Sequence, residues 1–280
     1  MKTLNTVKET RDTISSLRKE GKSIGFVPTM GALHAGHLSL LRMSKAENDI
    51  SVCSIFVNPI QFNNPGDLEK YPRTLAEDLA KLESHGCDIV FAPSVEEMYP
   101  EKVKKEYDFG HLDKVMEGSR RPGHFNGVAI VVKKLFDICL PYRAYFGEKD
   151  FQQLMIIKKL VEMEKLPVEI VPCPIIRERD GLAMSSRNVR LTTHNRSLAP
   201  EIHATLMTLK EQASRYPFID ALEEAKIRLS RHKEIKLEYV EIVDENTLLH
   251  VSAWDGAGHL RAFIALFLGE VRLIDNMKIS

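Results

Sequence analysis

Cysteine is scarce in this chain of 280 residues, and a long apolar run is absent. The four cysteines, Cys53, Cys87, Cys139 and Cys173, are scattered and form no C-x-x-C pair. This pattern is typical of reduced thiols and argues against a disulfide framework or a zinc site. The longest apolar run, Ala262–Leu268, is much shorter than the ~20 residues that a membrane helix needs. We therefore expect neither structural disulfides nor a membrane partner.

An excess of charge of either sign is also absent. The chain holds 39 basic and 39 acidic residues, and the charges balance separately on both sides of residue 176. Because nucleic-acid-binding proteins usually present a basic surface, we expect no nucleic-acid partner. The 44% of hydrophobic residues exclude the acidic, disordered class. The N-terminal residues lack the apolar core of a signal peptide, so we expect a cytoplasmic protein.

Apolar runs alternate with amphipathic helical stretches through the first two thirds of the chain. The expected strands are 24–28, 50–57, 88–92, 143–147 and 168–171, and the expected helices are 36–47, 73–84 and 149–163. Strands that are apolar throughout and alternate with helices predict parallel pairing, with helices on both faces of the sheet. We expect an α/β fold with a Rossmann-like, doubly wound sheet, whose ligands bind at the carboxyl ends of the strands.

The pattern changes after about residue 176. Two helical stretches, 196–215 and 219–232, are followed by expected strands at 237–243, 260–268 and 270–275. Helices followed by a small, antiparallel sheet predict a smaller C-terminal domain of the α+β kind. We therefore expect two domains, 1–176 and 177–280, which agrees with a length of roughly 150 residues per domain.

The most informative stretch, Pro28–His37, links the first expected strand to the next helix. Gly31 and Gly36 allow close backbone approach, and a helix N-terminus offers N–H groups and a positive dipole end to phosphate. His34 and His37 share one face of the opening turn, where they can donate hydrogen bonds to a triphosphate. A bare H-x-x-H is more often structural, and it lacks a third metal ligand nearby. Its place directly after a strand favours phosphate binding.

Two further stretches carry groups that suit phosphate. In Gly181–Arg187, small hydroxyl residues and an arginine can clamp phosphate oxygens, although a Ser/Thr turn in a loop explains them equally well. In Phe146–Gln153, Lys149 can meet a phosphate as a point charge. Asp150 is an ordinary residue for a helix start. Of the two glutamines that end this stretch, at most one points toward a cleft at the strand ends.

These motifs together resemble a known family. H-x-G-H at His34–His37 with a later M-S-S-R is similar to the signature of the adenylate-forming and nucleotidyl-transferring enzymes. The stretches Phe56–Phe62, Arg121–Phe125, Phe146–Gln153 and Asp180–Arg187 narrow the resemblance to the pantoate–β-alanine ligases, or pantothenate synthetases. The resemblance runs from Pro28 to Asn188 with the motifs in the family's order. The C-terminal third carries weaker signatures.

The resemblance implies an enzyme that condenses pantoate with β-alanine, using ATP and Mg²⁺, through a pantoyl adenylate. AMP and pyrophosphate are released, and the family implies a homodimer. The implied catalytic residues are His37, His34, Lys149 and Arg187. The implied ATP contacts are Met30, Gly31, Ala32, Leu33, His34, Ala35, Gly36, His37, Gly147, Glu148, Lys149, Asp150, Ile176, Met184, Ser185, Ser186 and Arg187. Gln61 is implied against both pantoate and β-alanine, and Gln153, rather than Gln152, against pantoate. No residue is implied as a metal ligand.

Some features stay open at the sequence level. Ala183 stands where the related tRNA synthetases have lysine, so the cations must come from Arg187 and Lys149. Arg121 and His124 line the acyl pocket in one interpretation and flank a Pro-Gly turn in another.

Other classes of protein remain as alternatives. A nucleotidyltransferase would share the H-x-G-H motif, but that function gives no reason for the later stretches. An RNA-binding synthetase fragment conflicts with the balanced charge, and an ATP sensor would differ only in lacking turnover. We also expect the C-terminal domain to act as a lid on the ATP site.

Overall fold

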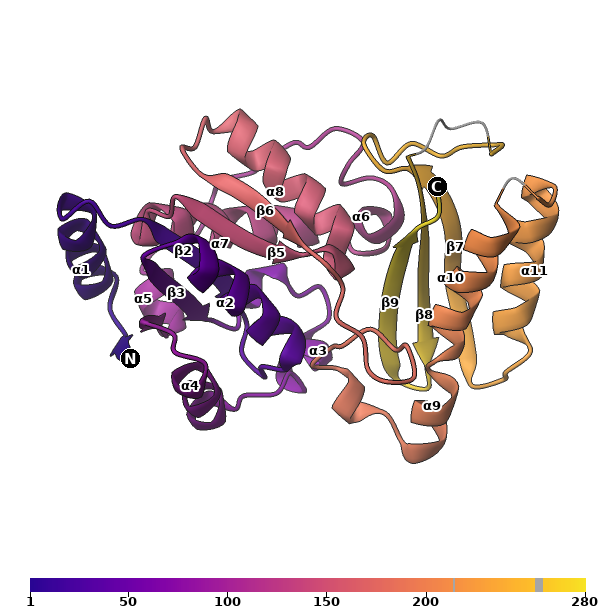
Figure 1. The fold of residues 1–280 in the computed structure, drawn as a ribbon, viewed down its shortest axis with the longest axis horizontal. Coiled ribbons are helices and arrows are strands. Elements are labelled where there is room, and N and C mark those ends of the chain that lie inside the picture. The colour runs from indigo at the N-terminus through magenta and orange to yellow at the C-terminus, as the bar shows by residue number, and fades with distance from the viewer. Residues whose placement is uncertain (214, 255–258) are drawn as a thin grey trace. The chain divides into compact units, whose positions relative to one another are not determined.

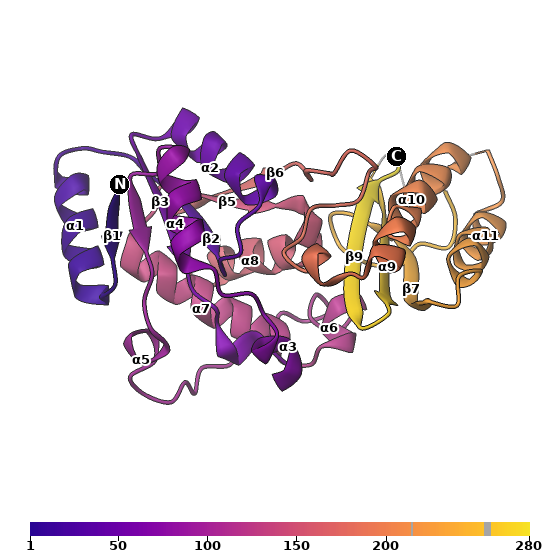
Figure 2. The same ribbon diagram turned by 90° about the horizontal axis from the view of Figure 1, so that it is seen from below.

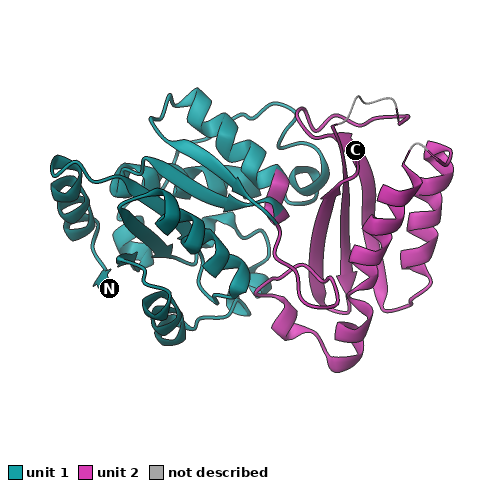
Figure 3. Cartoon of the chain, viewed as in Figure 1, with its two compact units in different colours: residues 1–148, 152–174 teal, residues 149–151, 175–280 magenta. Residues whose placement is uncertain are grey.

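The computed structural model describes residues 1–213, 215–254 and 259–280. This part of the chain divides into two compact units, which Figure 3 colours separately. Unit 1 comprises residues 1–148 and 152–174, and unit 2 comprises residues 149–151 and 175–280. The change of unit at 174/175 is close to the expected boundary at 176/177. The short segment 149–151, however, groups with the C-terminal residues.

Unit 1 is built on a six-stranded sheet in the order β1-β4-β3-β2-β5-β6, labelled in Figure 1. The strands are β1 (Lys2–Leu4), β2 (Ile24–Thr29), β3 (Ile50–Ile55), β4 (Ile89–Phe91), β5 (Arg143–Gly147) and β6 (Glu169–Cys173). Every neighbouring pair is parallel, which confirms the expected doubly wound α/β sheet. The edge strand β1 was not expected, because only its pairing with β4 identifies three residues as a strand.

Helices cover both faces of this sheet. They are α1 (Val7–Lys19), α2 (Ala35–Glu47), α3 (Pro65–Glu69), α4 (Leu75–Ser84), α5 (Val95–Met98), α6 (Met116–Arg120), α7 (His124–Cys139) and α8 (Phe151–Met163), with short 3₁₀ turns η1 (Pro59–Gln61) and η2 (Glu148–Asp150). Figure 2 shows α2 and α7 on opposite faces. Helix α7 was not among the expected helices; most of its residues are buried, and its partly exposed residues form one narrow stripe, at positions 126, 130, 133, 134 and 137.

All four cysteines are unpaired and buried, as their scattered positions predicted. Burial raises the pKa of Cys87 to about 11 and that of Cys173 to about 12. It also raises the pKa of the Cys53 and Cys139 thiols. The thiols therefore stay protonated at neutral pH and pack as small apolar side chains.

Unit 2 has an antiparallel sheet in the order β7-β8-β9, which confirms the expected α+β architecture. Its elements are η3 (Asn188–Arg190), α9 (Thr193–Leu198), α10 (Glu201–Gln212), α11 (Phe218–Ser230), β7 (Ile235–Asp244), β8 (Leu260–Leu268) and β9 (Val271–Lys278). Leu206, Leu209 and Leu229 of the helices share one buried cluster with Ile264 and Leu266 of β8. The helices therefore pack on one face of the sheet.

The prediction of a single helix over 196–215 is wrong. The chain forms α9 and α10 instead, and Pro200 stands at the start of α10. A proline in a helix interior has no N–H for the helical hydrogen bond, so the chain begins a new helix there. Residue 214 of that prediction lies outside the described residues. Among the described helices, none has the length and apolar character that spanning a membrane demands.

Candidate functional site

The loop between β2 and α2 in unit 1 carries the two candidate histidines. His34 caps α2: its Nδ1 accepts a hydrogen bond from Gly36 N at 3.1 Å, and His37 Nδ1 accepts from His34 N at 3.3 Å. The two ring centroids are 4.1 Å apart. Since both Nδ1 atoms are acceptors, the neutral rings carry their protons on Nε2. The loop thus holds two neighbouring imidazoles as Nε2–H donors.

The backbone of this loop is held by a buried carboxylate. Asp78 of α4 accepts hydrogen bonds from Ala32 N at 2.8 Å and Leu33 N at 2.7 Å, and a third from the Thr74 hydroxyl at 3.1 Å. Ala32 has a φ of 50°, a left-handed conformation that costs energy for a residue with a Cβ. The amides of Ala32 and Leu33, two of the implied ATP contacts, therefore donate to Asp78.

Sequence reasoning missed Asp78, although a signal was present. It lies four residues before Leu82 in α4, on the same side of the helix, and these two residues are the buried ones of α4. The side chain is fully buried. A carboxylate on a buried helix face must find hydrogen-bond donors, and here the donors are the backbone of the histidine loop.

The second candidate group surrounds Gln61, at the end of η1. Its Oε1 accepts from Asn58 Nδ2 at 3.0 Å, and its Nε2 lies 3.1 Å from the sulfur of Met30. Asn58 Oδ1 in turn accepts from the Tyr99 hydroxyl at 2.8 Å, which leaves its Nδ2 to donate to Gln61 and to the Gly127 carbonyl. The structure thereby brings Gln61 beside Met30, although the two motifs follow different strands, because β2 and β3 are neighbours.

Helix α7 supports the same turn. A Cβ at Gly127 would collide with the Ile60 carbonyl and the Gln61 Cα, so this close approach requires glycine. His124 Nδ1 lies 2.8 Å from the Gln61 carbonyl, and its Nε2 lies 3.0 Å from Arg121 Nη1. Because a guanidinium only donates, Nε2 is the acceptor and Nδ1–H donates to Gln61. The structure therefore places Arg121 and His124 in support of the Gln61 backbone.

Gln152 and Gln153, the two glutamines of α8, differ in their surroundings. Gln152 is 3% exposed, and its amide bonds the carbonyls of Leu112 and Val115 and the Glu117 N–H. Those bonds use both ends of the Gln152 amide within the chain. Gln153 is partly exposed. The assignment of Gln153, rather than Gln152, to pantoate stays a prediction.

The remaining candidates belong to unit 2, apart from Gly147 and Glu148. The Lys149 carbonyl accepts a hydrogen bond from Asn276 Nδ2 at 2.9 Å. The Lys149 Nζ atom lies 3.6 Å from Asp150 Oδ1. The Ile176 carbonyl accepts from Met184 N at 3.0 Å. Ser185 Oγ accepts from Arg187 N at 3.2 Å, so the Ser/Thr turn considered for this stretch is present. The loop between Ile176 and Met184 is also closed by a bridge between Arg177 and Ala183.

Metal-ligating side chains do not gather in the part of the chain that the structure describes. Within residues 1–213, 215–254 and 259–280, no group of three or more His, Cys, Asp or Glu side chains is arranged to hold a metal ion. The described candidate groups instead offer imidazole, amide, ammonium and guanidinium donors. Such donors bind anions, and a metal ion that accompanies an anionic ligand would be held mainly by that ligand.

Comparison with known proteins agrees with this picture. Residues 2–278 match the family model described as pantoate-beta-alanine ligase. The pantothenate synthetase of Bacteroides fragilis is 50% identical over 278 residues, and that of Phocaeicola vulgatus is 51% identical over 279 residues. Each alignment covers 99% of both chains.

Solved structures of the same kind share the fold. The crystal structure of pantothenate synthetase from Thermus thermophilus has a TM-score of 0.94 and 44% identity, with 100% of both chains covered. The pantoate-beta-alanine ligase from Francisella tularensis, complexed with beta-gamma ATP and beta-alanine, has a TM-score of 0.83 and 36% identity, covering 99% of this chain and 97% of that one. The chain described here therefore belongs to the pantoate–β-alanine ligase family.

Proposed function

We propose that this protein joins pantoate to β-alanine in an ATP-dependent reaction that passes through a pantoyl adenylate. The observation that carries the proposal is the loop before α2, which presents His34 and His37 as neighbouring Nε2–H donors near Gln61. Pantoate and ATP are both anions, so a site that brings them together needs donors and positive charge. The Francisella relative, complexed with beta-gamma ATP and beta-alanine, supports the same substrates.

The chemistry follows from the poor electrophilicity of a carboxylate at neutral pH. A pantoate carboxylate oxygen attacks the α-phosphorus of ATP; the new P–O bond forms as the bond to pyrophosphate breaks. The β-alanine amine then attacks the acyl carbon of the adenylate, the C–N bond forms, AMP leaves, and the amine gives up a proton. No protein nucleophile is needed, and the buried, protonated thiols of this chain do not offer one.

We assign the phosphate contacts from the family resemblance. His37 and His34 donate hydrogen bonds to phosphate oxygens, and Lys149 and Arg187 neutralise charge as it moves onto pyrophosphate. The other proposed ATP contacts are Met30, Gly31, Ala32, Leu33, Ala35, Gly36, Gly147, Glu148, Asp150, Ile176, Met184, Ser185 and Ser186. Since Asp78 occupies the amides of Ala32 and Leu33, these two residues would contact ATP through other atoms.

Gln61 is the proposed contact to pantoate and β-alanine, and Gln153 a second contact to pantoate. Asn58 holds Gln61 Oε1, so the Gln61 amide N–H faces Met30. A carboxylate or hydroxyl oxygen is a better acceptor than thioether sulfur, and a substrate oxygen would take its place. Mg²⁺ is proposed as the counter-ion of the ATP phosphates, held mainly by phosphate oxygens.

Product analysis tests this function directly. Protein, ATP, Mg²⁺, pantoate and β-alanine should yield pantothenate, AMP and pyrophosphate in equal amounts. A nucleotidyltransferase would instead leave AMP attached to its product, and an ATP sensor would consume no ATP. Without β-alanine, labelled pyrophosphate should exchange into ATP only when pantoate is present. Exchange without pantoate would indicate an adenylated enzyme, and exchange that requires β-alanine would indicate a concerted reaction.

Three wider features stay predictions from the resemblance and the sequence. These are a homodimeric state, a cytoplasmic location and a role of residues 177–280 as a lid. Light scattering of the purified protein measures the first, and cell fractionation measures the second. Turnover of a chain shortened to residues 1–176 tests the third, because a shortened chain as active as the whole would need no lid.

A further inference from the structure

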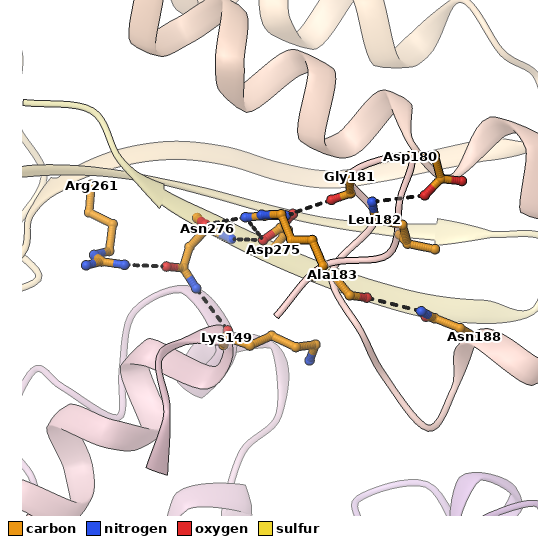
Figure 4. A network of polar contacts seen from close by, with 10 residues as sticks. Lys149, Asp180, Gly181, Leu182, Ala183, Asn188, Arg261, Asp275 and Asn276 are labelled. Carbon is orange, nitrogen blue, oxygen red and sulfur yellow. Dashed lines mark hydrogen bonds and ion pairs between the residues drawn. The ribbon is translucent and has the colours of Figure 1, made fainter. Parts of the chain in front are cut away.

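Asn276 of β9 holds the backbone of Lys149 in a fixed orientation. Arg261 Nη1 donates to Asn276 Oδ1 at 2.7 Å, and Asn276 Nδ2 donates to the Lys149 carbonyl at 2.9 Å (Figure 4). Because a guanidinium has no acceptor, Arg261 requires the Oδ1 atom to face it. The Nδ2 atom of Asn276 is therefore turned toward Lys149.

Arg261 is itself held firmly. It is 5% exposed, its guanidinium carbon lies 3.9 Å from the centroid of the Phe151 ring, and its Nη2 lies 3.2 Å from Glu245 Oε2. Stacking on an aromatic ring and pairing with a carboxylate both restrict a guanidinium to one plane. The segment 149–151 is thus held at both ends: Lys149 contacts β9 through Asn276, and Phe151 contacts β8 through Arg261.

The neighbouring residue, Asp275, holds the second candidate segment. Asp275 is 3% exposed and receives two bonds from Arg177, at 2.6 and 3.0 Å. Arg177 Nη1 also donates to the Gly181 carbonyl at 3.0 Å; Figure 4 labels Gly181 and Asp275. Gly181 has a φ of 92°, and a Cβ there would collide with the His203 ring. Asp275 and Arg177 therefore fix the start of the loop that leads into Met184–Arg187.

From these contacts we propose that Asp275 and Asn276 are positioning residues, which together place Lys149 and the segment Met184–Arg187 for phosphate transfer. This inference rests on the proposed function, because that function makes Lys149 and Arg187 the cations of the reaction. Neither Asp275 nor Asn276 is assigned a contact with substrate. Asn276 acts through the backbone carbonyl of Lys149, and Asp275 acts through Arg177.

The first test changes one donor. Asn276→Asp keeps the acceptor for Arg261 but replaces the donor to Lys149 with an oxygen that repels its carbonyl. We expect pantoate-dependent pyrophosphate exchange and pantothenate synthesis to fall together by about tenfold, the order expected for one lost buried hydrogen bond. Asn195→Asp is the matched control, because Asn195 Nδ2 also donates to a carbonyl of unit 2, that of Leu268. The control should retain its activity.

A double-mutant cycle separates positioning from general damage. In a Lys149→Ala background, Asn276→Asp should lower exchange by less than about twofold, because the group it positions is already gone. A merely structural effect would lower exchange by the same factor in both backgrounds, and that result would overturn the proposal. An unchanged exchange rate in Asn276→Asp, beside a strong loss in Lys149→Ala, would overturn it as well.

The second test addresses Asp275. Asp275→Asn removes the carboxylate that pairs with Arg177, and it should depress exchange more than about tenfold in the parent and much less in an Arg187→Ala background. Breaking a buried ion pair is strongly destabilising, so exchange is normalised to the folded fraction measured by circular dichroism. If Asp275→Asn does not fold, Arg177→Lys, which keeps the charge but loses the paired geometry, is taken through the same cycle. Equal losses in both backgrounds would overturn the role of Asp275.

Failure of the proposed function would look different. If Lys149→Ala and Arg187→Ala both exchanged pyrophosphate like the parent, these residues would not be the cations of the reaction. That outcome would overturn the proposed assignment together with the inference that depends on it. Strong losses in both single variants, with no coupling to Asn276→Asp or Asp275→Asn, would overturn the inference alone.

Discussion

The hydroxyl of Tyr99 donates a 2.8 Å hydrogen bond to Asn58 Oδ1, and this contact decides which way the Gln61 amide points. With Oδ1 occupied, the Asn58 amide nitrogen faces Gln61 Oε1. Burial raises the pKa of Tyr99 well above its usual value, so the hydroxyl keeps its proton and remains a donor throughout the physiological range. Tyr99 therefore prepares Gln61 as a donor, although it lies far from Gln61 in the sequence.

Tyr99→Phe should weaken the use of pantoate. Without the hydroxyl, the Asn58 amide can turn, and Gln61 loses its fixed orientation. We expect the KM for pantoate to rise by about tenfold, as for one lost buried hydrogen bond, with a nearly unchanged KM for ATP. Tyr145→Phe is the control, because the Tyr145 hydroxyl bonds Glu47 and Asn48 and not the Gln61 group. Equal effects of the two variants on pantoate would refute the role of Tyr99.

Gln61→Ala should raise the KM for pantoate far more than the dissociation constant of ATP. The amide is lost, but the histidine loop keeps its own hydrogen bonds to Asp78. Steady-state kinetics with varied pantoate and calorimetric titration with a non-hydrolysable ATP analogue measure the two quantities. A variant with normal dependence on pantoate and poor ATP binding would show that the two groups have been assigned in reverse.

His37→Ala should lower turnover by about 100-fold or more, the usual cost of losing one donor to a developing charge. Because His37 Nδ1 also accepts from His34 N, a second variant separates the two roles. His37→Asn offers an acceptor near the Nδ1 position but has no group at Nε2, so it should keep stability and still lose turnover. Near-normal turnover in a folded His37→Asn variant would contradict the assignment of His37.

Asp78→Asn should destabilise the fold and disturb the histidine loop. An amide has one acceptor oxygen, so one of the two N–H groups of Ala32 and Leu33 would face an NH₂ group. We expect a loss of about 1–3 kcal/mol in the free energy of unfolding, measured by urea denaturation. Asp12→Asn is the control, since Asp12 pairs with Lys8 on the exposed surface, where solvent screens the pair. A loss no greater than that of the control would show that Asp78 does not hold the loop.

Local sequence patterns determined much of this protein. Apolar strands separated by helices predicted the parallel sheet, because both faces of such strands are buried. The transition from an apolar strand to a helix that begins with His34 and His37 identified the loop between them as a candidate site, since residues one helical turn apart share a face. Patterns of this kind depend on residues within a few positions of each other, and they can be recognised without knowing the fold.

Tertiary structure decided the groups that hold the site in place. Asp78 binds a loop more than forty residues earlier, Tyr99 orients Asn58, and Asn276 bonds Lys149 from the other end of the sequence. An aspartate, tyrosine or asparagine has no local pattern that marks such a role. Its partner is chosen by the pairing of strands and the packing of helices, and a buried polar group must find that partner to offset its lost hydration. The residues proposed to touch substrate could thus be read from motifs, whereas those that orient them became visible only in the folded chain.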